Sequence, residues 1–159
     1  MSLCVLHIDD DENDVFLLKF AWEQAGLPHR LEAVRSGGEA MAYLQRQGEF
    51  ADSTRYPLPS LVLLDLRMPR MNGLEVLEWL RSQPQWQSLV VIALTASAYP
   101  DDIARACKLG ANAYVQKPGT HDELMGFLRA LQSFWFRFHE FAPTNWQAPC
   151  ELTRPELQP

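Results

Sequence analysis

Short apolar runs alternate with amphipathic stretches along most of this chain. The apolar runs are CVLHI from Cys4, LEAV from Leu31, LVLLDL from Leu61, LVVIAL from Leu89 and AYVQ from Ala113. Continuous apolar runs of this length are typical of strands that are buried on both faces of a sheet. The pattern therefore predicts five buried strands.

The stretches between these runs carry apolar residues at helical spacing. In the first, residues 14–25, four apolar side chains share one helical face: Val15, Leu18, Trp22 and Ala25. Gly26 and Pro28 then end the helix. Further helices are predicted over 38–46, 74–82, 100–109 and 122–138. A regular alternation of strand and helix predicts a parallel sheet with helices on both faces.

Residues 48–60 form a segment longer than an ordinary helix-to-strand loop, and we interpret them as an insertion. From Pro143 onward the sequence is rich in proline and lacks periodicity. A length of 159 residues, 47% of them hydrophobic, supports one core rather than two full domains. We expect one domain over residues 1–138 and a C-terminal extension over 139–159, either loosely ordered or packed on the last helix.

The charge balance is acidic, with 20 Asp and Glu against 14 Lys and Arg, and no run of basic residues. This disfavours nucleic acid and anionic membranes as partners. The three cysteines are widely spaced and have no neighbour at metal-ligand spacing. Neither a secretory signal nor an apolar run of membrane-spanning length is present in the sequence. We expect a soluble, cytoplasmic protein.

Polar side chains follow four of the predicted strands at the point where each strand ends. They are Asp9, Asp10 and Asp11 after the first strand, Asp65 after the third, Thr95 after the fourth, and Lys117 with Pro118 after the fifth. In an open parallel sheet, ligands bind at the carboxyl ends of the strands. Three carboxylates meeting there repel one another unless a hard divalent cation binds them, and Mg²⁺ is the natural candidate.

Such a site is suited to phosphoryl transfer. A metal ion would neutralise charge on an incoming phosphoryl group, and the ammonium of Lys117 and the hydroxyl of Thr95 would bind its oxygens. The carboxylate of Asp65 would attack phosphorus and form an acyl phosphate. Asp65 is hard to explain otherwise, because the residues on both sides of it are apolar, but the other residues each have a simpler interpretation. Considered alone, the three consecutive aspartates favour helix capping by roughly two to one, Thr95 suits a turn, and Lys117 suits a solvated position.

Four motifs resemble those of receiver domains of two-component response regulators, of the chemotaxis-receiver type: HIDDDEND, LVLLDLRMPRMNG, ALTAS and GANAYVQKP. The resemblance covers residues 3 to about 138. It implies a flavodoxin-like, doubly wound sheet of five parallel strands in the order 2-1-3-4-5. It also implies that Asp65 is phosphorylated, and that Asp9, Asp10, Asp65 and the backbone carbonyl of Arg67 hold Mg²⁺.

The same resemblance assigns roles to residues around the phosphorylated aspartate. It implies that Thr95 is a switch hydroxyl, that Lys117 pairs with the phosphoryl group, and that the bond from Lys117 to Pro118 is cis. Tyr114 would be the switch aromatic that turns inward, and simple packing at the sheet edge is the alternative. Arg67 and Ser97 each lie two residues after a residue of the site, so a further hypothesis is that they overhang the phosphoryl group and affect its hydrolysis; the alternative is an ordinary surface loop.

The turn after the third predicted strand contains two residues with special backbone requirements. Pro69 fixes one dihedral angle, and Gly73 suits a position that needs a positive φ. We interpret both residues as shaping the turn rather than taking part in chemistry.

The route of the output signal depends on the last predicted helix. Only 21 residues follow Phe138, too few for a helix-turn-helix domain, so we expect the signal to leave through contact with a downstream protein target. One helical stripe is predicted to face the core: Leu124, Leu128, Leu131, Trp135 and Phe138. Further apolar residues lie beyond it: Met125, Phe127, Phe134 and Phe136. Either the extension covers them or they form a partner or homodimer surface.

The insertion and the FWF sequence near the end of the last helix further resemble stand-alone receivers that are paired with bacteriophytochrome histidine kinases. The predicted function is therefore a switch that accepts a phosphoryl group from a sensor histidine kinase. It would catalyse only its own phosphorylation and dephosphorylation and would not be an enzyme acting on a metabolite.

Two other classes of protein share parts of this pattern. A phosphatase or phosphotransferase resembling haloacid dehalogenases has a second aspartate two residues after the nucleophile, and that position here is Arg67. This difference disfavours the enzyme class. A receiver that binds partners without phosphorylation would lack a site residue, and none is missing from this sequence.

Overall fold

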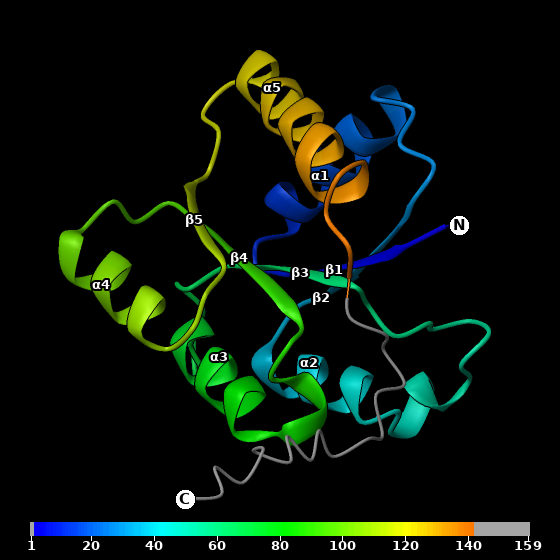
Figure 1. The fold of residues 1–159 in the computed structure, drawn as a ribbon, viewed down its shortest axis with the longest axis vertical. Helices are drawn as coiled ribbons and strands as arrows, with labels where there is room; N and C mark the ends of the chain where they lie inside the picture. The colour runs from blue at the N-terminus through cyan, green and yellow to red at the C-terminus, as the bar shows by residue number, and fades with distance from the viewer. Residues whose placement is uncertain (1, 142–159) are drawn as a thin grey trace, which may run out of the picture.

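The computed structural model of the chain describes residues 2–141. A single parallel sheet runs through the centre of the molecule (Figure 1), in the order β2-β1-β3-β4-β5. Its strands are β1 (Cys4–Ile8), β2 (Arg30–Val34), β3 (Leu61–Leu64), β4 (Val90–Thr95) and β5 (Ala113–Gln116). All four neighbouring pairs are parallel. The predicted flavodoxin-like sheet and its strand order are confirmed.

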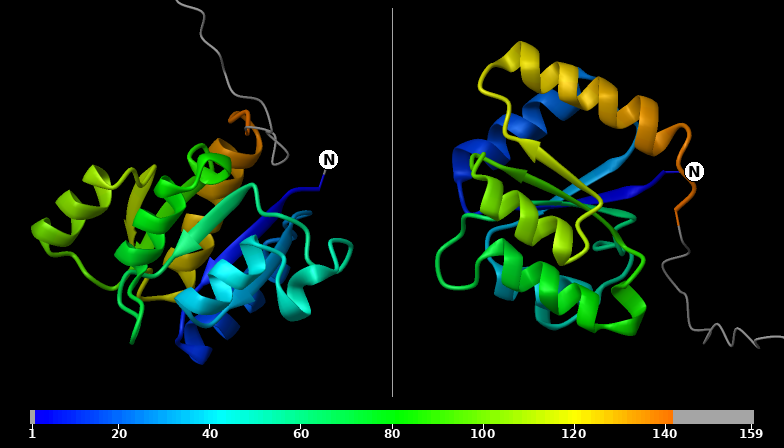
Figure 2. Two further views of the ribbon diagram at one scale, coloured as in Figure 1. Left: turned by 90° about the horizontal axis from the view of Figure 1, so that it is seen from below. Right: turned by 60° about the vertical axis from the view of Figure 1, so that its left-hand side comes forward.

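Five α-helices cover the two faces of this sheet. They are α1 (Glu12–Gln24), α2 (Gly37–Leu44), α3 (Gly73–Ser82), α4 (Pro100–Lys108) and α5 (His121–Leu131). In Figures 1 and 2, α1 and α5 lie side by side on one face, and α2 and α3 lie on the other, with α4 beside β5. Each connection between strands passes through a helix, as parallel pairing requires.

The core consists of two clusters separated by the sheet. Val5 of β1 packs with α1 and α5, whereas its neighbours Leu6 and Ile8 pack with α2 and α3. All five residues of β1 are buried. Both faces of the central strands thus lie against helices, which explains why their sequences are continuous apolar runs rather than alternating ones.

Only one of the three consecutive aspartates caps a helix. Asp11 is the N-cap of α1, and its Oδ1 accepts hydrogen bonds from the backbone N–H groups of Asn13 (2.8 Å) and Asp14 (3.3 Å). The capping interpretation is therefore right for Asp11, which leaves Asp9 and Asp10 available for other contacts.

The predicted insertion, residues 48–60, is folded against α2. It contains a short 3₁₀ helix, η1 (Gly48–Ala51), whose Phe50 is buried. The rings of Tyr43, Phe50 and Tyr56 meet with centroids 5.1 to 5.9 Å apart. The hydroxyl of Tyr43 donates to the carbonyl of Pro57 (2.8 Å). Aromatic packing thus holds the insertion on the body of the domain.

The last helix differs from the prediction. Instead of one helix over 122–138, α5 ends at Leu131 and continues as a π-helix, η3 (Gln132–Phe136). Leu131 is buried as expected, but Phe138 is 71% exposed. Trp135, also predicted to face the core, packs against the cluster of α1 and α5. Because a π-helix bonds residue i to i+5, it advances by a smaller angle per residue, so the predicted stripe is out of phase by Phe138. Phe136 turns inward instead, with its ring edge-on to Trp22 (6.0 Å).

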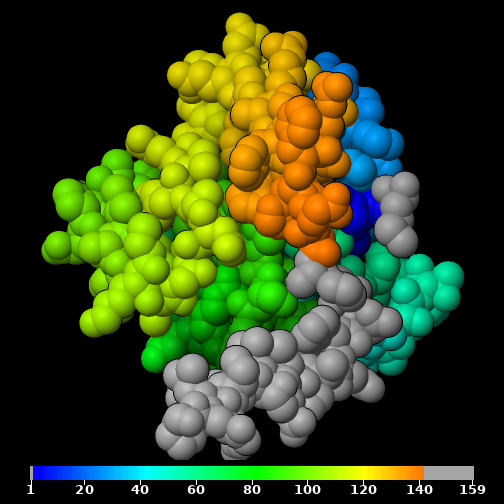
Figure 3. Space-filling model, viewed as in Figure 1, coloured from blue at the N-terminus to red at the C-terminus, as the bar shows by residue number. Residues whose placement is uncertain are grey.

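The segment that follows η3 lies at the surface of the molecule, below α5 in Figure 3. The ring of His139 contacts those of Trp135 (4.7 Å) and Phe141 (4.8 Å). Phe141 is partly buried against the cluster of α1 and α5. From residue 142 on, the predicted C-terminal extension lies outside the described residues, as does Cys150. Within residues 2–141, no helix combines the length and apolar character needed to cross a membrane.

Candidate functional site

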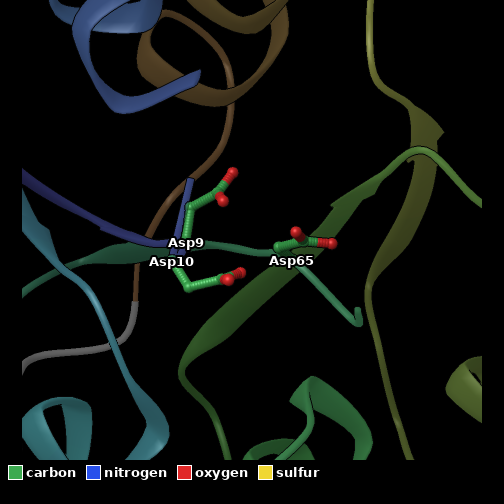
Figure 4. Close-up of side chains that lie close together, drawn as sticks. All are labelled: Asp9, Asp10 and Asp65. Carbon is green, nitrogen blue, oxygen red and sulfur yellow. The ribbon is translucent and has the colours of Figure 1, made fainter. Parts of the chain in front are cut away.

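Three carboxylates meet at the carboxyl ends of β1 and β3. Asp9 and Asp10 follow β1 directly, and Asp65 follows β3, its neighbour in the sheet. The backbone N–H of Asp65 donates to the carbonyl of Ile8 (2.9 Å), which fixes the two strand ends side by side. One oxygen from each carboxylate lies within 4.8 Å of the others (Figure 4). The structure thus brings together the three predicted acidic residues.

Backbone donors hold two of these carboxylates in place. Oδ1 of Asp9 accepts from the backbone N–H of Asp11 (3.0 Å), and Oδ1 of Asp65 accepts from that of Arg67 (3.0 Å). Asp9 and Asp65 are buried, and Asp10 is partly exposed. Burial makes their negative charges costly unless a cation lies close.

Lys117 supplies a cation at the end of β5. Its Nζ lies 2.8 Å from Oδ2 of Asp9, 3.0 Å from Oδ2 of Asp65 and 2.6 Å from Oδ2 of Asp14. Three carboxylates therefore share one ammonium, and Asp10 adds a fourth negative charge beside them. The site keeps an excess of negative charge.

The contacts of Lys117 and Asp9 keep both groups ionised at neutral pH. Burial alone would lower the pKa of Lys117, but its hydrogen bonds to Asp14 and Asp9 and the charge of Asp65 raise the pKa overall. Burial alone would raise the pKa of Asp9, but the neighbouring His7 and Lys117 lower it overall. Lys117 and Asp9 thus face each other as a pair of opposite charges.

The donor set fits a hard divalent cation. Asp9, Asp10 and Asp65 offer oxygen ligands that converge, and their charge exceeds what Lys117 neutralises. Oxygen ligands and excess negative charge are what Mg²⁺ and similar ions require. These three carboxylates are the residues that would hold such an ion.

Thr95 and Tyr114 are joined through the loop between β4 and α4. Thr95 is buried at the end of β4, and its Oγ1 accepts from the backbone N–H of Ser97 (3.4 Å). The hydroxyl of Tyr114 donates to the carbonyl of Ser97 (2.8 Å), while its ring lies half-buried against the core. The side chain of Tyr114 therefore packs at the sheet edge. It is also hydrogen-bonded to Ser97, which lies two residues after Thr95.

Two predictions about backbone conformation are wrong. The bond between Lys117 and Pro118 was expected to be cis, but no peptide bond within residues 2–141 is cis. The trans isomer is the favoured one before proline by about 0.5–1 kcal/mol, and Lys117 reaches its carboxylate partners from it. Gly73 was expected to need a positive φ, but the residue with a positive φ in that turn is Arg70 (66°).

Gly73 is required for a different reason. A Cβ at this position would lie 2.2 Å from the backbone oxygen of Asp65 and 2.7 Å from Cα of Leu66. The first turn of α3 therefore rests directly on the backbone that carries the central carboxylate.

Sequence reasoning missed three residues of the site. Asp14 binds Lys117, and Asp102 of α4 accepts hydrogen bonds from Ser97 and Arg67. Both acids lie in the first turn of a helix, where acidic residues are common because they complement the helix dipole, so nothing in the sequence distinguished them. His7, the third, is fully buried in β1 and lies 3.3 Å from Asp9.

Comparison with known proteins gives consistent matches. Residues 5–129 match the family model of the response regulator receiver domain. The chain is similar to the response regulator Rcp1 of Synechocystis sp., at 34% identity over 131 residues, which cover 82% of this chain and 87% of Rcp1. The crystal structure of Mn²⁺-bound Rcp1 is similar with a TM-score of 0.77, covering 89% of this chain and 99% of Rcp1.

Two further solved structures are similar over most of the chain. The phosphorylated cyanobacterial phytochrome response regulator RcpA is 31% identical with a TM-score of 0.81, covering 90% of this chain and 100% of RcpA. The bacteriophytochrome response regulator RtBRR is 36% identical with a TM-score of 0.70, covering 91% of this chain and 86% of RtBRR.

Proposed function

The chain belongs to the response regulator receiver domains, and from this premise we propose that it accepts a phosphoryl group on Asp65 from a histidine kinase and switches conformation in response. One observation carries the proposal. Asp65 lies where the ammonium of Lys117 (3.0 Å) and the carboxylates of Asp9 and Asp10 converge. A carboxylate that lies between a cation and a pair of metal-binding carboxylates is well placed to accept a phosphoryl group.

The transfer step follows from these positions. An oxygen of Asp65 attacks phosphorus, the P–N bond of the kinase phosphohistidine breaks, and its electron pair stays on the imidazole. Lys117 exchanges a carboxylate for a phosphoryl oxygen, and Thr95 donates its hydroxyl to another. The product is an acyl phosphate on Asp65, formed without any other substrate being turned over.

Mg²⁺ is the metal ion we propose for this site. Asp9, Asp10 and Asp65 would hold it, together with the backbone carbonyl of Arg67. When bound, the ion would neutralise charge that develops on the phosphoryl oxygens. The oxygen-only donor set supports a hard cation, and Rcp1 binds Mn²⁺, an ion of the same hard class.

The conformational switch would begin at Thr95 and pass through Ser97. To donate to a phosphoryl oxygen, Thr95 must move toward Asp65 and change its contact with the N–H of Ser97. The carbonyl of Ser97 holds the hydroxyl of Tyr114. A shift of this loop therefore changes the position of Tyr114, as expected of a switch pair.

The surface proposed to meet the kinase lies on α1. Phe16, Leu17 and Phe20 are 66%, 49% and 47% exposed, and the rings of Phe16 and Phe20 stack (6.3 Å). Asp14, on the same helix, is bonded to Lys117, so this apolar surface borders the phosphorylation site. A kinase domain that presents a phosphohistidine to Asp65 would cover it. The names of RcpA and RtBRR support a phytochrome-type kinase as the partner.

The output surface we propose is the last-helix face, defined as Phe134 and Phe138 with η3 around them. These two rings are 57% and 71% exposed. Large exposed aromatic side chains are enriched at protein interfaces, which supports a homodimer or a downstream protein target on this face.

The free thiols of Cys4 and Cys107 support a reducing compartment, the cytoplasm.

Intact-mass measurement after incubation with acetyl phosphate and Mg²⁺ tests the chemistry. Wild-type protein should gain one phosphoryl group, Asp65→Asn should gain none, and chelation of Mg²⁺ should abolish the gain. Lys117→Ala should slow labelling by roughly a hundredfold, because one charge-stabilising donor is lost. Asp101→Asn, a change at an exposed acid of α4, is the matched control. If wild-type protein gained no phosphoryl mass from acetyl phosphate and none from a histidine kinase, the proposal would be ruled out.

A further inference from the structure

One carboxylate on α4 ties together the two loops that border Asp65. Oδ2 of Asp102 accepts hydrogen bonds from Oγ of Ser97 (2.5 Å) and from the guanidinium of Arg67 (2.7 Å). Arg67 lies two residues after Asp65, and Ser97 lies two residues after Thr95. The loops after β3 and β4 are thus joined through the first turn of α4.

Every polar group of Ser97 is engaged in this arrangement. Its hydroxyl donates to Asp102, its N–H donates to Thr95, and its carbonyl accepts from Tyr114. A serine hydroxyl has only one proton to donate, so Ser97 cannot also donate to a phosphoryl oxygen while bonded to Asp102. Ser97 is buried, which leaves it few alternative orientations.

Arg67 is held in the same way on the other loop. Its guanidinium pairs with Asp102 and lies over the ring of Tyr99 (5.7 Å). The hydrogen bond from Ser97 and the pairing with Arg67 keep the pKa of Asp102 below its usual value, so Asp102 is charged at neutral pH. The pairing is therefore between two full charges.

A phosphoryl group on Asp65 would compete with Asp102 for Arg67. The backbone N–H of Arg67 already donates to Oδ1 of Asp65, so its side chain starts beside the phosphorylation site. A phosphoryl group carries nearly two negative charges and three acceptor oxygens, against one charge on Asp102. Guanidinium groups bind phosphate with paired hydrogen bonds, so the phosphoryl group is the stronger partner.

We propose that Asp102 is a latch that holds Arg67 and Ser97 on α4 while Asp65 is unphosphorylated, and that phosphorylation opens the latch by drawing Arg67 away. The latch rests on the proposed phosphorylation of Asp65. It gives phosphorylation a second route to α4, through the side chain of Arg67, in addition to the movement of Thr95 and Tyr114, and the two routes meet at Ser97. Asp102 acts through Arg67 and Ser97, so it is a positioning residue. Removing its charge should favour the phosphorylated conformation.

The affinity for beryllofluoride, a phosphoryl mimic that binds with Mg²⁺, tests the latch directly. Measured by ¹⁹F NMR, Asp102→Asn should bind beryllofluoride roughly two- to fivefold more tightly than wild type, the range expected for losing one partly exposed ion pair. The gain should disappear when Arg67→Ala is present, since no guanidinium then remains to be released. Asp101→Asn removes the adjacent acidic charge and should bind as wild type does.

Each outcome of this experiment either supports the proposed latch or overturns it. The latch would be overturned if Asp102→Asn bound beryllofluoride with wild-type affinity. It would also be overturned if the gain in affinity from Asp102→Asn persisted in the Arg67→Ala background. Either result would leave the phosphorylation proposal standing. A wild-type protein that binds neither beryllofluoride nor a phosphoryl group would overturn both. Should Asp102→Asn fail to fold, the Nε–H resonance of Arg67 in wild type gives the answer: it must shift on adding beryllofluoride, and an unmoved resonance refutes the latch.

Discussion

The ammonium of Lys117 lies closer to Asp14 than to the aspartate at the centre of the site. Nζ is 2.6 Å from Oδ2 of Asp14, compared with 2.8 Å for Asp9 and 3.0 Å for Asp65. Asp14 belongs to α1, and Lys117 follows β5. The contact therefore connects the phosphorylation site to the helix that carries the proposed kinase surface.

Replacing Asp14 measures what this contact contributes. We expect Asp14→Asn to lower the free energy of unfolding by about 0.5–1 kcal/mol, a small effect because the Asp14 side chain is 38% exposed and solvent screens the pair. Urea denaturation at pH 7 provides the measurement. In a Lys117→Met background the same change should have almost no effect, because the partner is gone. Equal losses in the two backgrounds would contradict a direct interaction.

Alkaline pH should destabilise the fold through the buried thiol of Cys4. Burial raises the pKa of Cys4 from 9.0 to about 11. The unfolded chain then loses this proton at lower pH than the folded protein does, so stability that is complete below pH 9.0 is lost as pH rises toward 11. We expect a total loss of about 2–3 kcal/mol, at about 1.4 kcal/mol per pKa unit.

Comparison of variants is needed to separate this effect, because burial also raises the pKa of Tyr43, which causes a further loss of stability above its ordinary value of 10.0. Urea titrations between pH 8 and 10.5 should give a smaller dependence on pH for Cys4→Ala than for wild type. Cys107→Ser, a change at an exposed thiol, should retain the wild-type dependence. A Cys4→Ala slope equal to that of wild type would show that the thiol does not titrate as expected.

The centre of the sheet could be predicted from the sequence because its three central strands are buried on both faces, whereas the outer strands β2 and β5 are only partly buried. Every residue of β1, β3 and β4 is buried, so each strand appears as a mainly apolar run. The polar residues at the ends of the strands are then conspicuous, and Asp65, Thr95 and Lys117 could be identified there. At these positions the pattern of apolar residues in the sequence and the burial of the strands in the folded protein lead to the same assignment.

Other features depend on geometry that residue types do not encode. The change from α- to π-helix after Leu131 alters which side chains face the core, yet the helical spacing continues without a break as far as Phe138. Asp102 has the same sequence signature as any acid that begins a helix. The need for Gly73 arises from a strand that lies nearby only in the folded chain.

A methyl group at Gly73 should disrupt the site. The added Cβ would lie 2.2 Å from the backbone oxygen of Asp65, and backbone cannot rotate away as a side chain can. We expect Gly73→Ala to lose about 3 kcal/mol or more of unfolding free energy and to impair phosphorylation. Gly126→Ala is the matched control, since its Cβ meets open space in α5. That change should stabilise by about 0.5–1 kcal/mol, and equal behaviour of the two variants in urea would refute this account.

The exposed rings of α1 should matter for the kinase and not for the chemistry. We expect the double variant Phe16→Ala, Phe20→Ala to slow phosphotransfer from an autophosphorylated bacteriophytochrome kinase by roughly tenfold, because interface aromatic side chains contribute strongly to binding. Labelling by acetyl phosphate needs no protein contact and should keep its wild-type rate. Radiolabel transfer and intact mass measure the two reactions. If both reactions slowed equally, the rings would be acting on the site itself.

The last-helix face should control self-association. Phe134 and Phe138 are 57% and 71% exposed, so replacing them removes apolar surface without opening a cavity in the core. We expect wild-type protein to sediment as a dimer in analytical ultracentrifugation and the variant Phe134→Ser, Phe138→Ser to sediment as a monomer with an unchanged melting temperature. Phe16→Ser removes a comparably exposed ring from α1 and should leave the dimer intact. A monomeric wild type, or a dimer that survives both substitutions, would assign this face to a different partner protein.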